Sequence, residues 1–562
     1  MKKTLYALSS VLLLSVSSFA QNTELINGRL RATIGSQGQT TFVNPGHSFL
    51  DVMEDGEWVS LILEAGLLIG GQDPNGELVL YSTQGADLEA GIRDLGVEIS
   101  QPWRVTGEQI LAHLADYNDN GVVDNPIFEI FAWPGTGSAS SEEYNGFPLW
   151  DDQNIFQMSG FWDSVSNGSY FPSQGDYPIV SIRGCLDAEP RTIPEEMIFI
   201  PILLRDDNGQ LVFEVQLTAF RFGCEEMGSA IGNSLFFHYK ILNVSGMQFD
   251  NVYVGYWADG DLGCYRDDYL GVFDDRKAVY FYNARAEDSF CELSDDNRFS
   301  GPPAAFAIDI LRGPLDQTGT EIPLSNVMPI YNGSVIQSVP PATTDPATIM
   351  EYYNYLSGRW RDGSPLVDQG IGYGGEGEQV AFPFTGDPAA NTGWTEIGED
   401  NPIADRRAIM SSGPFTLLPG AINEFIFSLT FSQEPDLDHL QQITELRSKI
   451  DTVQAFFDSC FDLSGMMPGV CTPLLTGTED ELIPTNNQLL LYPNPASNQV
   501  NISFPVNESG TLAVFSADGR MLLQKRTLSD RITLDLQDWP KGLYVVRWKG
   551  EYELRFNKLL VD

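Results

Sequence analysis

Alternating hydrophobic and polar positions recur through the middle of the chain and predict β-strands. Residues 198–204 and 211–221 form the clearest pair, because an Asp-Asn-Gly turn at residues 207–209 separates them. In the second run, hydrophobic side chains occupy every other position from Phe213 to Ala219, which predicts one buried face. Similar runs occur at residues 235–242, 252–257, 278–282 and 425–431. We therefore predict a mainly β chain with a β-sandwich body.

One helical periodicity interrupts this pattern. Hydrophobic residues recur at steps of three and four after Pro435, at Leu437, Leu440, Ile443, Leu446, Ile450, Val453 and Phe457. Proline suits the first turn of a helix, and the spacing predicts one long amphipathic helix that packs against a sheet. The following residues 462–487 are rich in Gly, Pro, Thr and Asp, which is typical of a linker.

The first twenty residues have the pattern of a signal peptide. Lys2 and Lys3 precede an apolar run at residues 5–16, and small residues then lead to Ala20, the expected cleavage position. A membrane anchor is the alternative, but the run is shorter than the roughly 20 residues that a spanning helix needs. No later segment has the required length and apolarity, so we expect a mature chain without a transmembrane segment.

The last part of the chain predicts a second, smaller sandwich. Short strand patterns occur at residues 500–504, 511–515, 521–524, 532–536, 542–548 and 552–561. Asp518-Gly519 supplies a hairpin turn between two of these strands. We expect them to form an immunoglobulin-like β-sandwich.

These patterns divide the chain into five parts. They are a signal peptide at residues 1–20, an N-terminal body region at 21–180, a β-rich main body ending in the helix at 181–461, a linker at 462–487, and a C-terminal domain at 488–562. More than one hydrophobic core is expected at this length.

The C-terminal domain also carries sequence motifs. It begins with Tyr492-Pro493-Asn494-Pro495, contains Gly542-Leu543-Tyr544-Val545-Val546, and ends on Lys558-Leu559-Leu560-Val561. In these residues the segment resembles the type A C-terminal sorting domain of the type IX secretion system. The resemblance implies contact with the type IX secretion machinery and passage through the periplasm to the outer-membrane surface or the extracellular space. It further implies attachment of the body to cell-surface lipopolysaccharide after removal of the sorting domain, or release.

The body resembles a group of large uncharacterised cargo proteins of the same system. The resemblance lies in segments at residues 259–263, 267–271, 313–314, 386–388, 393–396, 405–407 and 411–414. That group implies secretion and no particular activity.

The excess of acidic residues over basic ones limits the classes of binding partner that we expect. The chain holds 77 Asp and Glu against 32 Lys and Arg, a formal net charge of −45. Such a charge repels phosphate backbones and anionic membrane surfaces, so no nucleic acid partner is expected. It attracts divalent cations, although acidity alone also keeps an extracellular protein soluble.

Six cysteines are an even number in an exported chain and permit disulfides. They are Cys185, Cys224, Cys264, Cys291, Cys460 and Cys471. Several pairings are open. We predict sequential pairing, with Cys460 bonded to Cys471 across a short loop that contains Gly and Pro. The chain has no Cys-x-x-Cys motif, which excludes the usual zinc and redox motifs.

One segment has the spacing of a calcium loop. Oxygen-bearing side chains fall at loop positions 1, 3, 5 and 9, Gly121 lies at position 6, and the carbonyl at position 7 would also bind. The predicted ligands are Asp116, Asn118, Asn120, the Val122 carbonyl and Asp124. Position 12 is Ile127 rather than Glu. The alternative is a turn rich in Asn and Gly that binds no metal.

A second segment has the same outline with one ligand missing, because Val165 stands where an Asn or Asp is expected. It resembles the calcium repeats of extracellular spacer modules. Its candidate ligands are Asp163, Asn167, Ser169 and Asp176. Calcium is therefore the expected cofactor.

A third group of acids lies at Asp259, Asp261, Asp267, Asp268, Asp274 and Asp275. Such a group could supply the carboxylate pair of a glycosidase. A solvated acidic loop and another cation site are the alternatives. Asp405-Arg406-Arg407 could bind an anion or form a local ion pair.

No other catalytic pattern emerges. The histidines His47, His113, His238 and His439 form no His-Glu-x-x-His motif, and Gly-x-Ser-x-Gly is absent from the sequence. We expect a secreted or cell-surface protein that is not an enzyme, stabilised by calcium and acting in adhesion, matrix or surface-layer formation. The alternative is a secreted hydrolase, a glycosidase or protease, that uses the carboxylates at residues 259–275.

Overall fold

The computed structural model divides the chain into two compact units, Met1–Thr476, called the body below, and Gly477–Asp562, called the C-terminal unit. In the body it describes residues 23–34, 48–83, 98–99, 102–131, 133, 160–162, 164–165, 172–180, 182–185, 191–223, 229–288, 291, 298–336, 338–462 and 474–476. In the C-terminal unit it describes residues 489–492, 496, 498–503, 510–516, 521–527, 531–537, 539–549 and 554–561.

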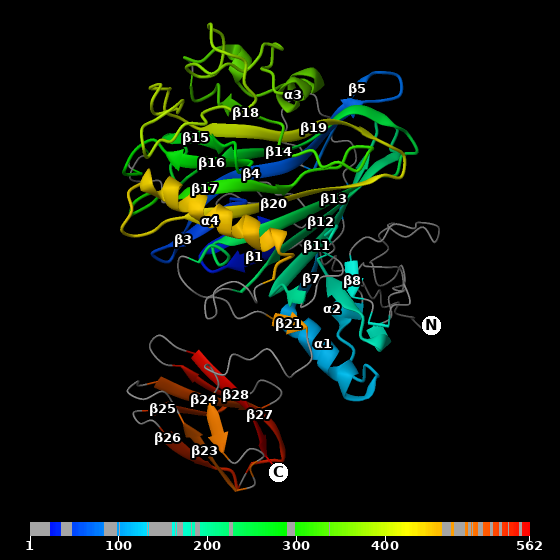
Figure 1. Cartoon of the computed structure of the whole chain (residues 1–562), viewed down its shortest axis with the longest axis vertical. Helices are drawn as coiled ribbons and strands as arrows, with labels where there is room; N and C mark the ends of the chain where they lie inside the picture. The colour runs from blue at the N-terminus through cyan, green and yellow to red at the C-terminus, as the bar shows by residue number, and fades with distance from the viewer. Residues whose placement is uncertain are drawn as a thin grey trace, which may run out of the picture. The chain divides into compact units, whose positions relative to one another are not determined.

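The first sheet of the body joins strands from the start, middle and end of the unit. Its described strands run in the order β1 (Thr23–Asn27), β2 (Leu30–Ile34), β3 (Leu50–Glu54), β4 (Glu57–Gln72), β14 (Phe249–Gly260), β19 (Arg406–Leu417) and β18 (Asn326–Tyr331). Strand β5 (Leu78–Ser82) also pairs with β4, outside the strand order given above. Neighbouring strands are antiparallel throughout. The long strands β4, β14 and β19 lie side by side (Figure 1).

The second sheet runs in the order β15 (Asp268–Phe273), β16 (Ala278–Asn283), β17 (Ala305–Arg312), β20 (Ile422–Ser432), β13 (Ser234–Asn243), β12 (Leu211–Arg221), β11 (Glu196–Arg205) and β6 (Glu98–Ile99). Strand β7 (Trp103–Thr106) also pairs with β11. The predicted hairpin is β11 and β12, in which Ile198 lies opposite Ala219. Two short pairs complete the body, β8 (Gly160–Trp162) with β9 (Tyr177–Ile179) and β10 (Arg191–Ile193) with β21 (Leu474–Thr476).

A large hydrophobic core lies between the two sheets. On β12 the alternating side chains from Phe213 to Ala219 enter this core, as their spacing predicted. They meet side chains of the first sheet such as Val254 and Tyr256 of β14. The mainly β, sandwich-type body is confirmed.

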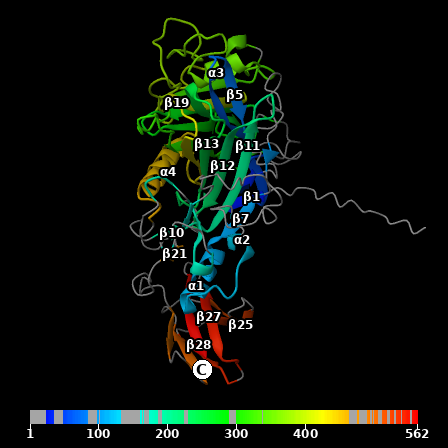
Figure 2. The same ribbon diagram turned by 90° about the vertical axis from the view of Figure 1, so that its right-hand side faces the viewer.

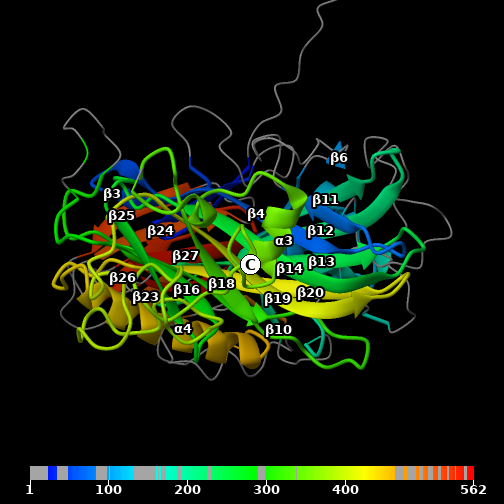
Figure 3. The same ribbon diagram turned by 90° about the horizontal axis from the view of Figure 1, so that it is seen from above.

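Helices cover the outer faces of this sandwich. The long predicted helix is α4 (Gln441–Asp458), which lies beside β17 and β20 (Figures 1 and 3). Its buried residues Ile443, Leu446 and Ile450 pack on tyrosines and alanines of β15, β16 and β17. Helix α3 (Ile349–Leu356) lies against β5 and the first sheet (Figure 2). Short helical turns occur at α2 (Phe128–Phe131), η1 (Pro172–Gln174) and η2 (Pro341–Thr343).

Helix α1 (Gly107–Asn120) was not among the predicted elements. Thr106 caps its first turn, and the side chain of Gln109 accepts a hydrogen bond from the Thr106 N–H, which completes a capping box. The helix ends at Gly121, whose φ of 79° is left-handed. Ile110 and His113 form its buried side.

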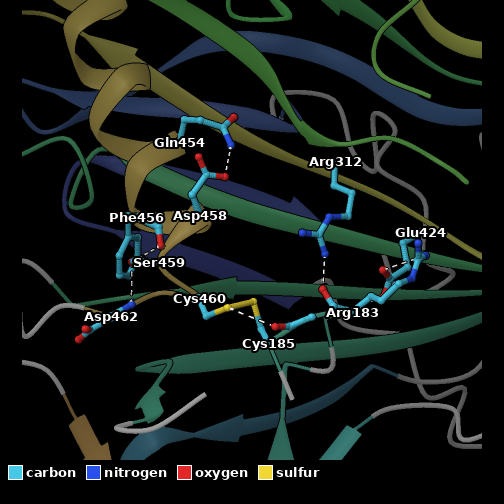
Figure 4. Close-up of a disulfide and its surroundings, with 11 residues drawn as sticks. Arg183, Cys185, Arg312, Glu424, Gln454, Phe456, Asp458, Ser459, Cys460 and Asp462 are labelled. Carbon is cyan, nitrogen blue, oxygen red and sulfur yellow. Dashed lines mark hydrogen bonds and ion pairs between the residues drawn. A yellow bond between two sulfur atoms is a disulfide. The ribbon is translucent and has the colours of Figure 1, made fainter. Parts of the chain in front are cut away.

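Two disulfides lie among the described residues. Cys264 bonds to Cys291, as sequential pairing predicted. Cys460 bonds to Cys185 rather than to Cys471, so that prediction was wrong (Figure 4). The reason is the packing of α4, since Phe456 and Phe461 join a core with Phe222 of the strand region and thereby hold Cys460 beside Cys185. Cys224 and Cys471 lie outside the described residues.

The C-terminal unit is a small antiparallel sandwich. One sheet contains β22 (Leu490–Tyr492), β23 (Gln499–Ser503) and β26 (Arg531–Asp535). The other contains β25 (Met521–Thr527), β24 (Gly510–Ser516), β27 (Gly542–Lys549) and β28 (Leu554–Val561). Buried residues of both sheets, such as Val500, Trp548 and Val561, form one core.

Candidate cation site

The first predicted calcium loop lies at the end of helix α1 instead of in an open loop. Asp116, Asn118 and Asn120 are helical. The Asp116 carboxylate accepts hydrogen bonds from the backbone N–H and the side-chain amide of Asn125, at 2.9 and 3.1 Å. The Asn120 amide donates to Asp124 at 2.7 Å, and its oxygen accepts from the Val122 N–H at 2.8 Å. The side chains of Asp116, Asn120 and Asp124 thus form hydrogen bonds with amide groups of the same segment. Calcium binding at this segment stays a prediction.

Of the second predicted loop, Asp163, Asn167 and Ser169 lie outside the described residues. Asp176 is fully buried, and its carboxylate accepts hydrogen bonds from the N–H and hydroxyl of Ser164, at 2.9 and 3.0 Å. The Asp176 carbonyl contacts His113 Nε2 at 2.7 Å. Asp176 therefore joins this turn to helix α1, and its role as a ligand is untested.

The third group of acids divides in two. Asp274 and Asp275 are exposed in the turn between β15 and β16, where Asp275 pairs with Arg276 and Arg447. The other four acids, at the end of β14 and the start of β15, are buried. They are Asp259, Asp261, Asp267 and Asp268.

Asp405 joins the buried acids from the start of β19. Strand pairing places Asp259 opposite Arg407, which brings the preceding Asp405 next to the end of β14. Carboxylate oxygens of Asp259, Asp261 and Asp405 lie within 4.8 Å of one another, and the residues are 2%, 9% and 4% exposed. These three residues are called the aspartate triad below.

The aspartate triad has little compensating positive charge. Arg407 Nε lies 3.0 Å from Asp259, and its Nη2 lies 3.5 Å from Asp405. The same guanidinium also pairs with the half-exposed Asp345 at 2.8 Å. Asn332 donates one hydrogen bond to Asp405 at 2.6 Å. One oxygen each of Asp259 and Asp405 has no hydrogen-bond partner among the described residues.

Burial raises the pKa of all three triad carboxyl groups. Burial and the neighbouring Asp405 raise the pKa of Asp259 well above the usual range, against the opposing effect of Arg407. The same causes raise the pKa of Asp261. Three carboxylates that share one arginine therefore need either protons or a further cation.

A second buried group adjoins the triad. Asp267 accepts a hydrogen bond from Asn283 at 3.1 Å, and Asp288 accepts from the N–H groups of Cys264 and Phe299. Burial and the neighbouring Asp288 raise the pKa of Asp267 to about 7, while burial raises that of Asp288 to about 6. The Cys264 sulfur is near these acids but is held in a disulfide, so it is no thiolate ligand.

Asp268 lies between the two groups. It is fully buried, its Oδ2 accepts the Leu262 N–H at 3.3 Å, and its Oδ1 has no partner in the described part of the chain. Burial first, and then the charges of Asp267 and Asp261, raise its pKa.

Glycines shape the backbone around these acids. Gly263 has a φ of +62°, and a Cβ there would lie 2.1 Å from an oxygen of Asp288. At Gly260 a Cβ would lie 2.5 Å from the Phe281 ring. The Asp-Gly-Asp-Leu-Gly sequence therefore permits a close approach that larger residues would prevent.

Arg406 has a separate role. It is fully buried and pairs with the equally buried Glu396 at 2.9 Å, and its guanidinium lies 4.5 Å from the centre of the Tyr331 ring. Arg406 and Arg407 thus form ion pairs within the body, which is the second of the two alternatives for this motif.

An oxygen-only set of ligands is typical of sites for hard cations such as calcium and magnesium, whereas zinc sites commonly include nitrogen or sulfur. The triad is buried, so a cation bound there would stabilise the fold and would not contact a polymer on the surface. Neither the spacing of the acids nor the local pattern identified Asp405 or Asp288 as neighbours. Only the pairing of β14 with β19, and the fold of the following loop, bring them together.

The sorting-motif residues lie on the strands of the C-terminal unit. Tyr492 ends β22, and Gly542 begins β27. The buried Tyr544 donates its hydroxyl hydrogen bond to the Pro540 carbonyl at 2.5 Å. Pro493, Asn494 and Pro495 lie outside the described residues.

Comparisons with known proteins identify this unit. Residues 490–562 match the family described as the secretion system C-terminal sorting domain. The chain is therefore a cargo protein of the type IX secretion system, exported to the cell surface or the extracellular space. Within the described residues, none of the helices has the length and apolarity to cross a membrane.

Two further comparisons take the chain as a whole. No curated protein matches the chain. Among solved structures, a polysaccharide lyase is similar over 64% of this chain at 9% identity, with a TM-score of 0.18. The chain covers 35% of the length of that lyase, and a TM-score this low supports no inference about fold or function.

Proposed function

We propose that the exported body is a non-enzymatic adhesion, matrix or surface-layer protein stabilised by a divalent cation, calcium, at the aspartate triad. The observation that carries the cation site is the buried set Asp259, Asp261 and Asp405, whose oxygens converge while Arg407 is the one cation paired with them in the described part of the chain. Attachment to cell-surface lipopolysaccharide after removal of the sorting domain belongs to the same proposal.

A cation at the triad would join segments that are distant in sequence. Asp259 is the penultimate residue of β14, and Asp405 precedes β19 in the first sheet. Asp261 belongs to the connection that leads to β15 in the second sheet. Binding to the folded state alone stabilises it by about 2.7 kcal/mol when calcium is a hundredfold above Kd. A surface protein in calcium-containing medium would thus gain stability after export. Calcium at the Asp116 loop and at Asp176 is proposed as an additional, separate contribution.

The test compares thermal unfolding of the full chain in EGTA and in millimolar calcium. We expect calcium to raise the unfolding midpoint of the wild type. Asp261→Asn should lose most of this rise, whereas the matched exposed substitution Asp274→Asn should retain it. An equal calcium response in Asp261→Asn and the wild type would reject the triad as the site.

The hydrolase remains the alternative proposal, and no observation favours it. Asp259 and Asp261 are 2% and 9% exposed, so a polymer cannot reach them without opening of the body. Asp274 and Asp275 lie in an exposed turn that already engages arginines. Release of sugars or peptides by the purified chain, abolished by Asp259→Asn, would favour the hydrolase.

A further inference from the structure

A cavity of about 230 Å³ lies beside helix α4, separate from the aspartate triad. Strand β17 contributes Asp309 to its lining, and α4 contributes Ile450 and Gln454. The turn before β16 and the segment after β17 complete the lining, the latter with Glu321 and Pro323. The cavity thus combines aliphatic walls with a few charged groups, as small-molecule sites commonly do.

Asp309 is the unusual residue of this cavity. Its neighbours Ile308 and Ile310 point into the core between the sheets, so alternation along β17 turns Asp309 toward the opposite, α4 side. Asp309 is only 1% exposed, and neither of its carboxylate oxygens has a hydrogen-bond partner among the described residues. A buried carboxylate without a partner is costly unless something supplies hydrogen bonds.

The cations near Asp309 are engaged elsewhere. Arg276 pairs with Asp275 and Asp451. The Lys277 ammonium donates to the Asp274 carbonyl at 2.8 Å.

The remaining charges add no partner for Asp309. Arg312 donates to the Arg183 carbonyl, as Figure 4 shows, and lies 3.9 Å from Glu321. On α4, Asp451 and Asp458 add negative charge near Asp309, and the Asp458 carboxylate accepts from Gln454 at 2.8 Å. Burial first, and then these two acids, raise the pKa of Asp309 well above its usual range.

We propose that this cavity binds a small organic cation whose ammonium or guanidinium group donates hydrogen bonds to the Asp309 carboxylate. Charge-assisted hydrogen bonds of this kind are stronger than neutral ones, and two free oxygens suit a bidentate guanidinium. Leu311 and Ile450, which also line the cavity, would contact an aliphatic stem. A divalent metal fits less well, because metal sites use several oxygen ligands, whereas the other carboxylates of the lining, Asp275 and Glu321, already pair with arginines.

The test titrates the full chain with n-butylammonium and n-butylguanidinium, with butanol and butyrate as the uncharged and anionic counterparts. Calorimetry should detect binding of at least one cation and of neither counterpart. Asp309→Asn should weaken that binding about tenfold or more. Asp274→Asn, an exposed acid outside the lining, should bind like the wild type. Asn has nearly the same shape as Asp and buries no charge at this position, so the variant should unfold at or above the wild-type temperature.

Three results would overturn the proposal. They are binding by Asp309→Asn at wild-type strength, binding of butanol as tight as that of the cations, and no detectable binding of either cation at millimolar concentration. Displacement of the cations by calcium in the wild type, together with direct calcium binding that Asp309→Asn abolishes, would show a metal site instead. Binding of only one cation would support the proposal and identify the head group.

Discussion

Replacing Asp267 by Asn should change how the stability of the calcium-free chain depends on pH. Burial and the neighbouring Asp288 raise the pKa of Asp267 from 3.8 to about 7 in the folded state. Between these two values the folded chain binds a proton that the unfolded chain releases. Stability therefore falls as pH rises through this window, and the full penalty is present above about pH 7. The amide of the Asp267→Asn variant does not titrate, so the variant lacks this penalty.

The magnitude follows from the two pKa values. Relative to the Asn variant, the wild type should lose about 3 kcal/mol of unfolding free energy between pH 5 and pH 8. The hydrogen bond from Asn283 survives in the variant, because the amide oxygen can accept it.

Urea unfolding of both proteins in EGTA at the two pH values measures the difference. Asp274→Asn, with an exposed side chain, is the control and should show no such change. A difference between wild type and Asp267→Asn that stays constant from pH 5 to pH 8, or that changes in the opposite direction, would refute the reasoning.

Three further changes have defined outcomes. Removing the Cys185–Cys460 disulfide should destabilise the body by about 2 kcal/mol more than removing Cys264–Cys291. The first bond closes a loop of 275 residues and the second a loop of 27, and the longer loop gains more entropy on unfolding when its bond is lost. Urea unfolding of the two variants measures the difference, and equal losses would contradict it. Glu396→Gln should cost about 3–5 kcal/mol because it leaves Arg406 buried without its partner, and a loss below about 1 kcal/mol would contradict this. Deletion of residues 489–562 should retain the body in the periplasm on cell fractionation, whereas undiminished surface or medium levels would contradict export through this unit.

Local patterns predicted much of the fold. Alternating hydrophobic residues identified the β11–β12 hairpin, and hydrophobic residues at steps of three and four identified α4. Both predictions succeeded because the spacing within a single strand or helix reveals which of its faces is buried. The motifs around Tyr492 and Gly542 identified the sorting domain for the same reason, since they lie within a short stretch of chain. Helix α1 was missed although Thr106 and Gln109 give a capping signal, because the calcium-loop spacing overlapped its last turn.

The candidate site could be predicted only in part. Asp259 and Asp261 were among the acids singled out, but Asp405 is distant in sequence and reaches them through the register of β14 and β19. The pairing of Cys460 with Cys185 depends likewise on where α4 ends in the fold. The short sequence distance between Cys460 and Cys471 does not predict that position. Contacts between elements that are far apart in sequence depend on sheet order, and no local spacing encodes that order.

A crystal of the full chain soaked with terbium, a calcium substitute with strong anomalous scattering, would locate the bound cation. We predict an anomalous peak among the carboxylates of Asp259, Asp261 and Asp405, and its loss in Asp261→Asn. Peaks confined to other regions, such as the Asp116 loop, or no peak at the triad in the wild type, would contradict a cation-stabilised aspartate triad.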